Sequence, residues 1–368
     1  MTEVFEMADE FGPEKVVHIS DVAAGLRAIV VIDNTAIGPS IGGVRMAPDV
    51  TLEECARLAR AMSRKNAAAG LPHGGGKSVI FADPAMPLAD KERLIRAYAR
   101  AIAQLSDYIP GPDMGTNEVC MAWVHDEIGR AVGLPRVIGG IPLDEIGATG
   151  LGVAVAADVA QPFSGVTLDG AQVAIQGYGA VGRHAARHLA QKGARIAAVA
   201  DSRGTAICKD GFDLPRLDAL KADGKSVTAY PGAMVAECHA VITAECDILV
   251  PAARPDIIDQ TNAAEIKARL IVEGANIPAT TAAEQDLHAR GVLVIPDFIA
   301  NAGGVICAAV EYHDGLESQV MATITEKIHR NTQEVLGQVR DKGILPRDAA
   351  NALAEARLRQ AMDLRRTF

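Results

Sequence analysis

A short glycine motif between a strand and a helix is the feature that most constrains the fold of this chain. Residues 177–182 read Gly-Tyr-Gly-Ala-Val-Gly, which fits G-x-G-x-x-G, and they follow the strand-like run 172–176 and open the helical stretch 183–192. The first glycine permits a tight turn, the second lets a pyrophosphate approach the helix N-terminus, and the third lets helix and strand pack closely. The motif therefore predicts a dinucleotide-binding site made by Gly177, Gly179, Ala180, Val181 and Gly182.

The next strand of this pattern ends in a carboxylate that bears on the choice of cofactor. Asp201 follows the strand-like run 195–200 and can accept a hydrogen bond from a ribose 2′-hydroxyl, whereas it would repel a 2′-phosphate. This favours NAD over NADP. Arg203 lies just beyond and could receive a phosphate, so NADP is not excluded.

Strand-like and helical stretches alternate through the second half of the chain, which indicates a doubly wound parallel sheet of the Rossmann type. The strand-like runs are 172–176, 195–200, 240–243, 247–251, 270–273 and 292–295. A chain of 368 residues is too long for one ordinary core, so we expect two α/β domains. The predicted boundaries are 1–148 for the first domain, 149–330 for the dinucleotide-binding domain, and 331–368 for C-terminal helices that pack on the first domain.

Composition and charge narrow the range of partners and compartments. The net charge of −10 argues against nucleic acid and anionic membranes, because both call for a basic face. The N-terminus has no apolar run of signal-peptide length, and no window approaches the roughly eighteen consecutive apolar residues of a membrane span. The six cysteines are scattered without a C-x-x-C pair, which is typical of thiols in a reducing compartment. We therefore expect a soluble, cytoplasmic protein.

Two lysines twelve residues apart, Lys65 and Lys77, are the candidate reacting groups. Thr51 and Glu54 form a capping-box pair, and the apolar residues that follow at helical spacing put Lys65 on the buried side of a helix that ends at Gly70. Lys65 is thus placed to hold a carboxylate as a fixed cation. Lys77 follows a glycine run near another cation, where we expect it to work as a neutral amine. The alternative, a pair of ordinary structural or exposed lysines, stays open.

Glycine- and proline-rich segments supply further candidates. Residues 38–45 read as a glycine-punctuated turn, where the backbone can approach a ligand closely. The segment 108–116 holds two prolines and two glycines around Asp113, which indicates a rigid loop and makes this aspartate a candidate proton shuttle or, alternatively, a loop cap. His184 and His188 lie four apart on a predicted helix, but a solvated helix face is a better interpretation than a metal site, so no metal is expected.

Together these motifs resemble the family of glutamate, leucine, valine and phenylalanine dehydrogenases, over nearly the whole chain from Gly38 to Glu311. The segment from Lys65 to Lys77 is similar to the two-lysine segment of that family, and 111–116 is similar to its catalytic-aspartate loop. The pattern is closest to the leucine, phenylalanine and valine enzymes. Further similar segments follow in family order: 149–153, 247–253, 273–276 and 301–305.

The resemblance implies roles for individual residues in an oxidative deamination. Lys65 would pair with the α-carboxylate of the substrate, Lys77 would act at the α-carbon, and Asp113 would move protons to and from the amino nitrogen. The α-hydrogen would leave as hydride to NAD, giving a 2-oxo acid and ammonia. Near the nicotinamide ribose and carboxamide, the resemblance implies Thr149, Asn276 and Asn301. Around the substrate, it implies Ile41, Gly42, Val305 and Ala308, and also Asn276 and Asn301. The first domain would also bind the substrate and mediate formation of a homo-oligomer.

Substrate choice depends on two positions. In the glutamate enzymes of the family, a lysine precedes the Gly-Gly pair and a hydroxyl residue follows Asn-Ala-Gly-Gly by four, and both hold the side-chain carboxylate. Here these positions are Ile41 and Ala308. Burying a carboxylate against them without partners would be costly, which predicts a branched-chain or aromatic L-amino acid as substrate. A glutamate dehydrogenase with rebuilt side-chain recognition and a dinucleotide-binding regulator without turnover remain as alternatives.

Overall fold

The computed structural model describes residues 4–365, which form two compact units. The first unit comprises the described residues up to Leu143, Val305–Val320, and those from Leu353 on, and the second comprises Asp144–Gly304 and Met321–Ala352. This division differs from the predicted boundaries at 148 and 330 in its C-terminal part. The difference arises because three C-terminal helices each have residues in both units.

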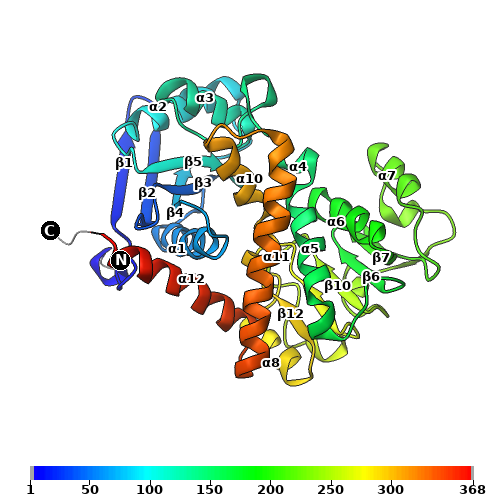
Figure 1. Ribbon diagram of the computed structural model, residues 1–368. Helices are drawn as coiled ribbons and strands as arrows, with labels where there is room; N and C mark the ends of the chain where they lie inside the picture. The colour runs from blue at the N-terminus through cyan, green and yellow to red at the C-terminus, as the bar shows by residue number, and fades with distance from the viewer. Residues whose placement is uncertain (1–3, 366–368) are drawn as a thin grey trace. The chain divides into compact units, whose positions relative to one another are not determined.

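The first unit is built on a five-stranded sheet with the order β1-β2-β4-β3-β5. β1 pairs antiparallel with β2 and β2 with β4, whereas β3 lies parallel to both β4 and β5. These strands are coloured from blue to cyan in Figure 1. Their bounds are β1 Lys15–Asp21, β2 Leu26–Asn34, β3 Ser40–Ala47, β4 Gly74–Phe81 and β5 Tyr108–Pro112.

Helices cover both faces of this sheet, and the alternation of side chains along each strand decides which residues meet which helix. On one face, α1 packs on an apolar cluster that includes Val31 and Val79. On the other face, α2 and α3 pack on a cluster that includes Val30 and Ile80. The bounds of the helices are α1 Leu52–Ala68, α2 Leu88–Ala101 and α3 Glu118–Ile128. The predicted start of α1 is confirmed, because the Thr51 side chain accepts a 3.1 Å hydrogen bond from the Glu54 backbone N–H.

Two predictions for glycine-rich segments of this unit were wrong. Residues 38–45 are not a turn, since Ser40–Ala47 forms β3 in the interior of the sheet. The segment from 108 is not a loop throughout, since its first part is strand β5. The glycines and prolines led to the interpretation of both strands as a turn or a loop, but a strand can contain these residues for different reasons. β5 lies at the edge of the sheet, where proline is tolerated. In β3, Gly42 leaves room for the backbone of Gly76 and Gly43 leaves room for the side chains of Asp113 and Lys77.

The second unit is built on a seven-stranded sheet with the order β12-β11-β10-β6-β7-β8-β9. β12, β11, β10, β6 and β7 run parallel, β8 pairs antiparallel with β7 at one edge, and β9 pairs antiparallel with β8. The predicted α/β class with a Rossmann-like sheet is confirmed, although β8 runs against the other six strands. The bounds are β6 Gln172–Gln176, β7 Arg195–Asp201, β8 Gly204–Ile207, β9 Met234–Ala236, β10 Ile248–Pro251, β11 Leu270–Val272 and β12 Leu293–Ile295.

Helices connect the strands of the second unit and continue into the C-terminal part of the chain. The bounds are α4 Leu143–Ile146, α5 Ala148–Ser164, α6 Ala180–Gln191, α7 Leu214–Ala222, α8 Thr281–Ala289, α9 Asp297–Ala300, α10 Gly303–Tyr312, α11 Glu317–Lys342 and α12 Pro346–Asp363. The strand predicted for 240–243 was wrong: Cys238–Val241 is a short 3-10 helix, whose Val241 is buried. A short apolar run is equally compatible with either structure.

One helical stretch is long and apolar enough to cross a membrane by length and composition alone, although Asp144, Glu145 and Asp158 interrupt its apolar residues. Leu143–Ser164 has a mean hydropathy of 1.2 over its most apolar window, and 61% of that window is buried in the structure. A core helix of a folded unit has the same composition, since its apolar surface is covered by other elements of that unit. The apolar character of α5 therefore agrees with its packing against α6, β11 and α9.

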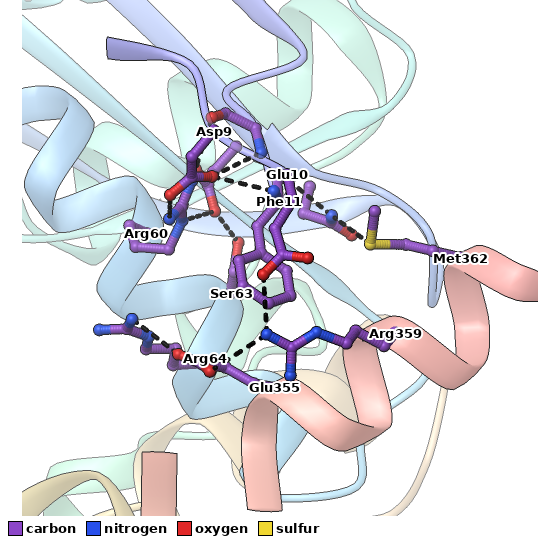
Figure 2. A network of polar contacts seen from close by, with 12 residues as sticks. Asp9, Glu10, Phe11, Arg60, Ser63, Arg64, Glu355, Arg359 and Met362 are labelled. Atoms are coloured by element: carbon purple, nitrogen blue, oxygen red, sulfur yellow. Dashed lines mark hydrogen bonds and ion pairs between the residues drawn. The ribbon is translucent and has the colours of Figure 1, made fainter. Parts of the chain in front are cut away.

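Both ends of the described chain pack on the outer side of α1 within the first unit (Figure 2). Arg60 of α1 donates through Nε to the buried Asp33, at 2.9 and 3.0 Å, and through both terminal nitrogens to Asp9, at 2.7 and 2.8 Å. The ring of Phe11 lies between two guanidinium groups, 5.7 Å from that of Arg60 and 4.8 Å from that of Arg359 on α12. Ser63 also donates to Asp33, at 2.5 Å. Arg60 thus joins the N-terminal segment, β2 and α1.

We expect Arg60→Ala to lower the free energy of unfolding by about 3 to 5 kcal/mol, because it leaves the Asp33 carboxylate buried without its cation. Arg359→Ala is the matched control. It removes the other cation over Phe11, but its partner Glu10 is exposed, so the loss should be much smaller. Denaturant unfolding of both variants measures this difference, and equal losses would contradict it.

Candidate active site

The two predicted catalytic groups meet on one face of the sheet in the first unit. Lys77 lies in β4, and Gly43 of β3 lies opposite it in the parallel register of the two strands. Asp113 directly follows β5, which runs parallel to β3 on its other side. Lys77 Nζ forms an ion pair with Asp113 Oδ2, and only 8% and 22% of the two side chains are exposed. Three neighbouring strands therefore deliver an ammonium and a carboxylate to one place.

Glycine at position 43 leaves room for this ion pair. A Cβ atom there would lie 2.7 Å from Asp113 Cβ and 3.1 Å from Lys77 Nζ. Both distances are shorter than the roughly 3.5–4.0 Å at which non-bonded carbon atoms pack best. Any side chain at this position would push the two charged groups apart.

Arg45 joins the pair from the same face of β3, two residues beyond Gly43. Its Nε lies 3.2 Å from Asp113 Oδ2, and its NH1 lies 2.5 Å from Glu54 Oε1 on α1. Burial alone would raise the pKa of Asp113, but the charge and hydrogen bond of Lys77, together with the charge of Arg45, outweigh burial and hold the pKa below its ordinary value. Asp113 is therefore a carboxylate at neutral pH.

Lys65 is half-buried in the last turns of α1, the helix that Glu54 ties to this charge network. Next to it, Asn66 donates from Nδ2 to the Gly74 carbonyl at 2.7 Å, which fixes the end of α1 to the start of β4. Arg357 of α12 donates to the carbonyls of Ala67 and Ala68, at 3.2 and 2.7 Å, and so caps the helix. Lys65 and Lys77 are thus carried by two elements that are joined directly.

The residues predicted to line the substrate side chain form one apolar cluster in the first unit. Ile41 and its register partner Ile109 are buried with Val132, and Ala308 and Tyr312 of α10 pack on them. The carboxylate of Glu311 holds α10 there by accepting hydrogen bonds from the backbone N–H groups of Leu134 and Ile141. Gly42 and Val305 also belong to this unit; the Gly42 carbonyl accepts from the hydroxyl of Tyr108 at 2.9 Å, and Val305 is half-buried on α10.

A pair of histidines lies beside this cluster. His73 is buried, its Nδ1 lies 3.1 Å from the Pro39 carbonyl, and its Nε2 lies 3.1 Å from Nε2 of His313. Since the Pro39 carbonyl accepts only, Nδ1 of His73 carries the proton and Nε2 accepts from His313. Burial lowers the pKa of His73 to about 4. His73 is therefore neutral at physiological pH and is not a fixed cation next to Tyr312, whose ring lies 5.5 Å from that of His73.

The glycine motif of the second unit has the geometry that a dinucleotide pyrophosphate requires. Gly177 has a φ of 95°, which allows the tight turn after β6. A Cβ atom at Gly179 would meet no atom within 4 Å, so space is open in front of the N-terminus of α6. A Cβ atom at Gly182 would lie 3.0 Å from Ile175 Cγ2, so this glycine lets α6 pack on β6. Ala180 and Val181 form the first turn of that helix.

Asp201 lies at the end of β7, as predicted, but its oxygens already have partners. Oδ1 accepts from the hydroxyl of Ser226 at 2.9 Å and from the Arg203 backbone N–H at 3.0 Å. Oδ2 accepts from Lys221 Nζ at 2.8 Å and from the Val227 backbone N–H at 3.0 Å. Burial would raise the pKa of Asp201, but these hydrogen bonds lower it to about 2. The expectation of a carboxylate that simply repels a 2′-phosphate is therefore not supported, because Lys221 neutralises it.

Asn276 and Asn301, which the family resemblance places near the nicotinamide and the substrate, contact each other. Asn301 Nδ2 donates to Asn276 Oδ1 at 3.0 Å and to the Ala275 carbonyl at 3.2 Å. Asn301 is buried and Asn276 is exposed, so Asn276 is the one that a ligand can reach. Thr149 lies in the first turn of α5, close to Gly304, where a Cβ atom would lie 3.4 Å from Thr149 Oγ1.

The interpretation of His184 as part of a solvated helix face was wrong. His184 is buried, because α5 and α6 pack closely: a Cβ atom at Gly150 of α5 would lie 2.6 Å from His184 Cβ. His188 is half-buried. Among residues 4–365 no three His, Cys, Asp or Glu side chains are grouped so as to hold a metal ion.

Sequence reasoning missed several residues that the structure adds to the two sites: Gly43, Arg45 and Glu54 around Asp113, and Lys221, Ser226 and Val227 around Asp201. Gly43 and Arg45 carried a signal that could have been found, because they alternate with Ile41 along one face of a strand. That signal was lost when 38–45 was interpreted as a turn. The partners of Asp201 come from 20 to 26 residues further along the chain, and no sequence spacing indicates them.

Two family models match this chain. The family model described as "Glutamate/Leucine/Phenylalanine/Valine dehydrogenase" matches residues 139–366, and the one described as "Glu/Leu/Phe/Val dehydrogenase, dimerisation domain" matches residues 13–130. The chain therefore belongs to the glutamate/leucine/phenylalanine/valine dehydrogenase family. It is an amino-acid dehydrogenase, an oxidoreductase of the class that uses a nicotinamide dinucleotide. The alternative of a regulator without turnover is set aside.

Named relatives and solved structures are similar over most of their length. The NADP(+)-dependent glutamate dehydrogenase of Pyrobaculum calidifontis is 38% identical over 358 residues, which cover 90% of this chain and 85% of that protein. The hetero-hexameric glutamate dehydrogenase of Thermus thermophilus, in a Leu-bound form, superposes with a TM-score of 0.84 at 32% identity, covering 97% of this chain and 91% of that one. The L-tryptophan dehydrogenase of Nostoc punctiforme superposes with a TM-score of 0.78 at 26% identity, covering 98% and 99%.

We expect the first unit to lose stability as the pH falls from about 6.5 to about 4. His73 titrates near its ordinary value when unfolded but only at a pKa of about 4 when folded. The unfolded chain therefore binds more protons in this window, which can remove up to about 3 kcal/mol. In His73→Phe this part of the loss should disappear, whereas His18→Gln, at an exposed histidine of β1, should retain it. Unfolding free energies measured across this pH range test the expectation, which fails if His73→Phe and the unchanged chain lose stability in parallel.

Proposed function

We propose that this chain catalyses the reversible, dinucleotide-dependent oxidative deamination of an L-amino acid with an apolar side chain. The observation that carries the proposal is the cluster of Ile41, Ile109 and Val132 with Ala308 and Tyr312, which offers an apolar surface on the same face of the sheet as Lys77. The reaction converts the amino acid, NAD(P)⁺ and water into the 2-oxo acid, ammonia, NAD(P)H and a proton. The bound cofactor supplies the acceptor for the hydride.

In this proposal three residues of the first unit have different roles in the reaction at the α-carbon. Lys65 pairs with the α-carboxylate and orients the substrate. Lys77, the ion-pair partner of Asp113 and not the neutral amine expected from the sequence, gives its hydrogen bond to the substrate oxygen or to the attacking water. Its charge stabilises the negative charge that develops there. Asp113 moves protons to and from the amino nitrogen. The ion pair between Lys77 and Asp113 supports this assignment. When a substrate binds between them, each of the two residues would contact the substrate in place of the other residue.

A glutamate dehydrogenase is the second candidate, and the names of the relatives favour it. The proteins from Pyrobaculum calidifontis and Thermus thermophilus are both called glutamate dehydrogenases. Glutamate as substrate would require a partner for its side-chain carboxylate. At Ile41 and Ala308 there is none, and the neighbouring His73 is neutral at physiological pH. A rebuilt pocket for glutamate would therefore need a cation from another source.

A screen of L-amino acids in the NAD(P)H-production assay tests the proposal directly. A higher kcat/KM for leucine, phenylalanine or tryptophan than for glutamate supports an apolar substrate. A higher value for glutamate rejects it in favour of the second candidate, while the absence of turnover with every amino acid would reject both.

For the cofactor, we propose that NADP is used as well as NAD. Lys221 and Arg203 together carry two positive charges at the end of β7 against the single charge of Asp201. With this balance of charge, the site is more favourable for the two negative charges of a 2′-phosphate than it would be with Asp201 alone. The relative named as an NADP(+)-dependent enzyme agrees with the proposal.

We also propose that the protein is soluble and cytoplasmic. We propose that it forms a homo-oligomer, since the N-terminal part matches a family model described as a dimerisation domain. β1 lies at the edge of its sheet, where its outer hydrogen-bonding groups can pair with a second copy, and Val22 just beyond it is 93% exposed.

Substrate choice should change when charge and hydroxyl are restored at the two pocket positions. We expect Ile41→Lys combined with Ala308→Ser to raise the ratio of kcat/KM for glutamate over leucine by about 100-fold or more, because the carboxylate then gains a cation and a donor. Ile41→Met with Ala308 unchanged is the control, and it should leave the ratio near its starting value. If the control shifts the ratio as much as the double variant, the two positions do not act through charge.

Lys221→Met should shift the cofactor preference towards NAD. The variant removes the cation that neutralises Asp201, so kcat/KM for NADP should fall about tenfold relative to that for NAD, the loss of one hydrogen bond to a charged group. Lys225→Met, at an exposed lysine that pairs with Asp223, is the matched control. Kinetics with both cofactors measure the ratio, and an unchanged ratio in Lys221→Met contradicts the assignment.

A further inference from the structure

A strained residue lies beside the exposed Asn276 of the second unit. Ile277 has a φ of 47°, in the left-handed region that β-branched residues rarely adopt. Three non-glycine residues of the described chain have positive φ, and Ile277 alone among them is β-branched; the others are Asp256 and Asp314. Packing does not explain the conformation, since Ile277 is 45% exposed. The strain must therefore be imposed by contacts of the backbone.

Both backbone groups of Ile277 have fixed partners. Its N–H donates to Asp297 Oδ2 at 2.9 Å, and its carbonyl accepts from the Asp256 N–H at 2.9 Å. Asp297 is only 6% exposed and stands at the start of α9, the short helix that leads to Asn301. The carboxylate of Asp297 thus links the segment that holds Asn276 to the helix that leads to Asn301.

Arg347 of α12 holds Asp297 and the start of the Asn276 segment at the same time. Its NH1 donates to Asp297 Oδ1 at 2.9 Å, and its NH2 donates to Glu273 Oε2 at 2.8 Å. Glu273 Oε2 also accepts from the backbone N–H of Asp297, at 2.9 Å. The remaining donors of the guanidinium go to Glu284 on α8, at 2.6 to 2.8 Å. One half-buried cation therefore ties together α8, α9, α12 and the end of β11.

This cluster is held by more contacts than a simple ion pair needs. Glu273 is fully buried, and burial raises its pKa well above the ordinary value, although the charge of Arg347 opposes this. Three carboxyl groups share one guanidinium, an arrangement that stability alone does not favour over apolar packing. What it does achieve is to fix the peptide on either side of Asn276, through Glu273 before it and through Ile277 after it.

We propose that Arg347 and Asp297 are positioning residues, which hold Ile277 in its left-handed conformation and so present the Asn276 side chain to the bound dinucleotide. The inference rests on the proposed function and on the role that the family resemblance implies for Asn276, which is contact with the nicotinamide end of the cofactor. Neither residue touches the cofactor itself; each acts through the backbone of the segment 273–277.

Asp297→Ala in the full chain tests the inference by two readouts. The Kd for NADH, followed by NADH fluorescence, should rise about tenfold, and kcat/KM for the dinucleotide should fall by a similar factor, while KM for the amino acid at saturating cofactor changes less. Asp297→Asn keeps an oxygen for the Ile277 N–H and should retain more affinity than Asp297→Ala. Equal losses in the two variants contradict the assignment.

Leu287→Ala is the matched control for a loss of stability alone. Leu287 is fully buried on α8 in the core of the same unit and makes no contact that this mechanism uses. The variant should lower the Tm and leave the Kd for NADH unchanged. If Asp297→Ala behaves in the same way, with a lower Tm and unaltered Kd and kcat/KM, the cluster is merely structural and the inference is wrong.

A double variant separates this inference from the proposed function. In the Asn276→Ala background, adding Asp297→Ala should cost no further affinity for NADH, because the side chain that it positions is already gone. A full additional loss rejects the positioning role while leaving the role of Asn276 intact. If Asn276→Ala alone changes neither the Kd nor kcat/KM, the role that the family resemblance implies for Asn276 is wrong, and the inference fails with it.

Discussion

The ion pair between Lys77 and Asp113 is the interaction on which the first unit's site depends. Two largely buried charges are stable at this place because each is the partner of the other and because Gly43 keeps the strand between them free of a side chain. Arg45 extends the pair to Glu54, and through Glu54 to α1, the helix that carries Lys65. The position of both lysines therefore follows from one continuous set of charges and hydrogen bonds.

Elsewhere in the chain, Arg60 and Arg347, both half-buried, connect several elements through ion pairs and hydrogen bonds. Arg60 joins the N-terminal segment, β2 and α1 through Asp9 and Asp33, and Arg347 joins four elements of the second unit through three carboxyl groups. In each case a planar guanidinium reaches several acceptors at once, which a lysine could not do with the same geometry. Elements that are distant in the sequence are thereby fixed to one another near candidate functional residues.

In the proposed function, specificity is decided away from these charges. The family to which the chain belongs makes it an amino-acid dehydrogenase, and Lys77 and Asp113 are proposed to act at the α-carbon. The side chain of the substrate would instead meet Ile41, Ala308 and their apolar neighbours, and the cofactor ribose would meet Asp201 with Lys221 beside it. The first feature is the basis of the proposed apolar substrate, and the second is the basis of the proposed use of NADP.

The sequence by itself determined the α/β class and the dinucleotide motif, because these depend on local periodicity and on residue types at short spacing. It also singled out Lys65, Lys77 and Asp113 as candidate residues of the site. It failed at β3 and β5, where glycine and proline hide strands whose hydrogen bonds come from neighbours far along the chain. It also could not reveal that Lys221 neutralises Asp201 or that Arg347 lies beside Glu273. Such contacts join residues 20 to 74 positions apart, and only the folded sheet and its helices bring them within hydrogen-bonding distance.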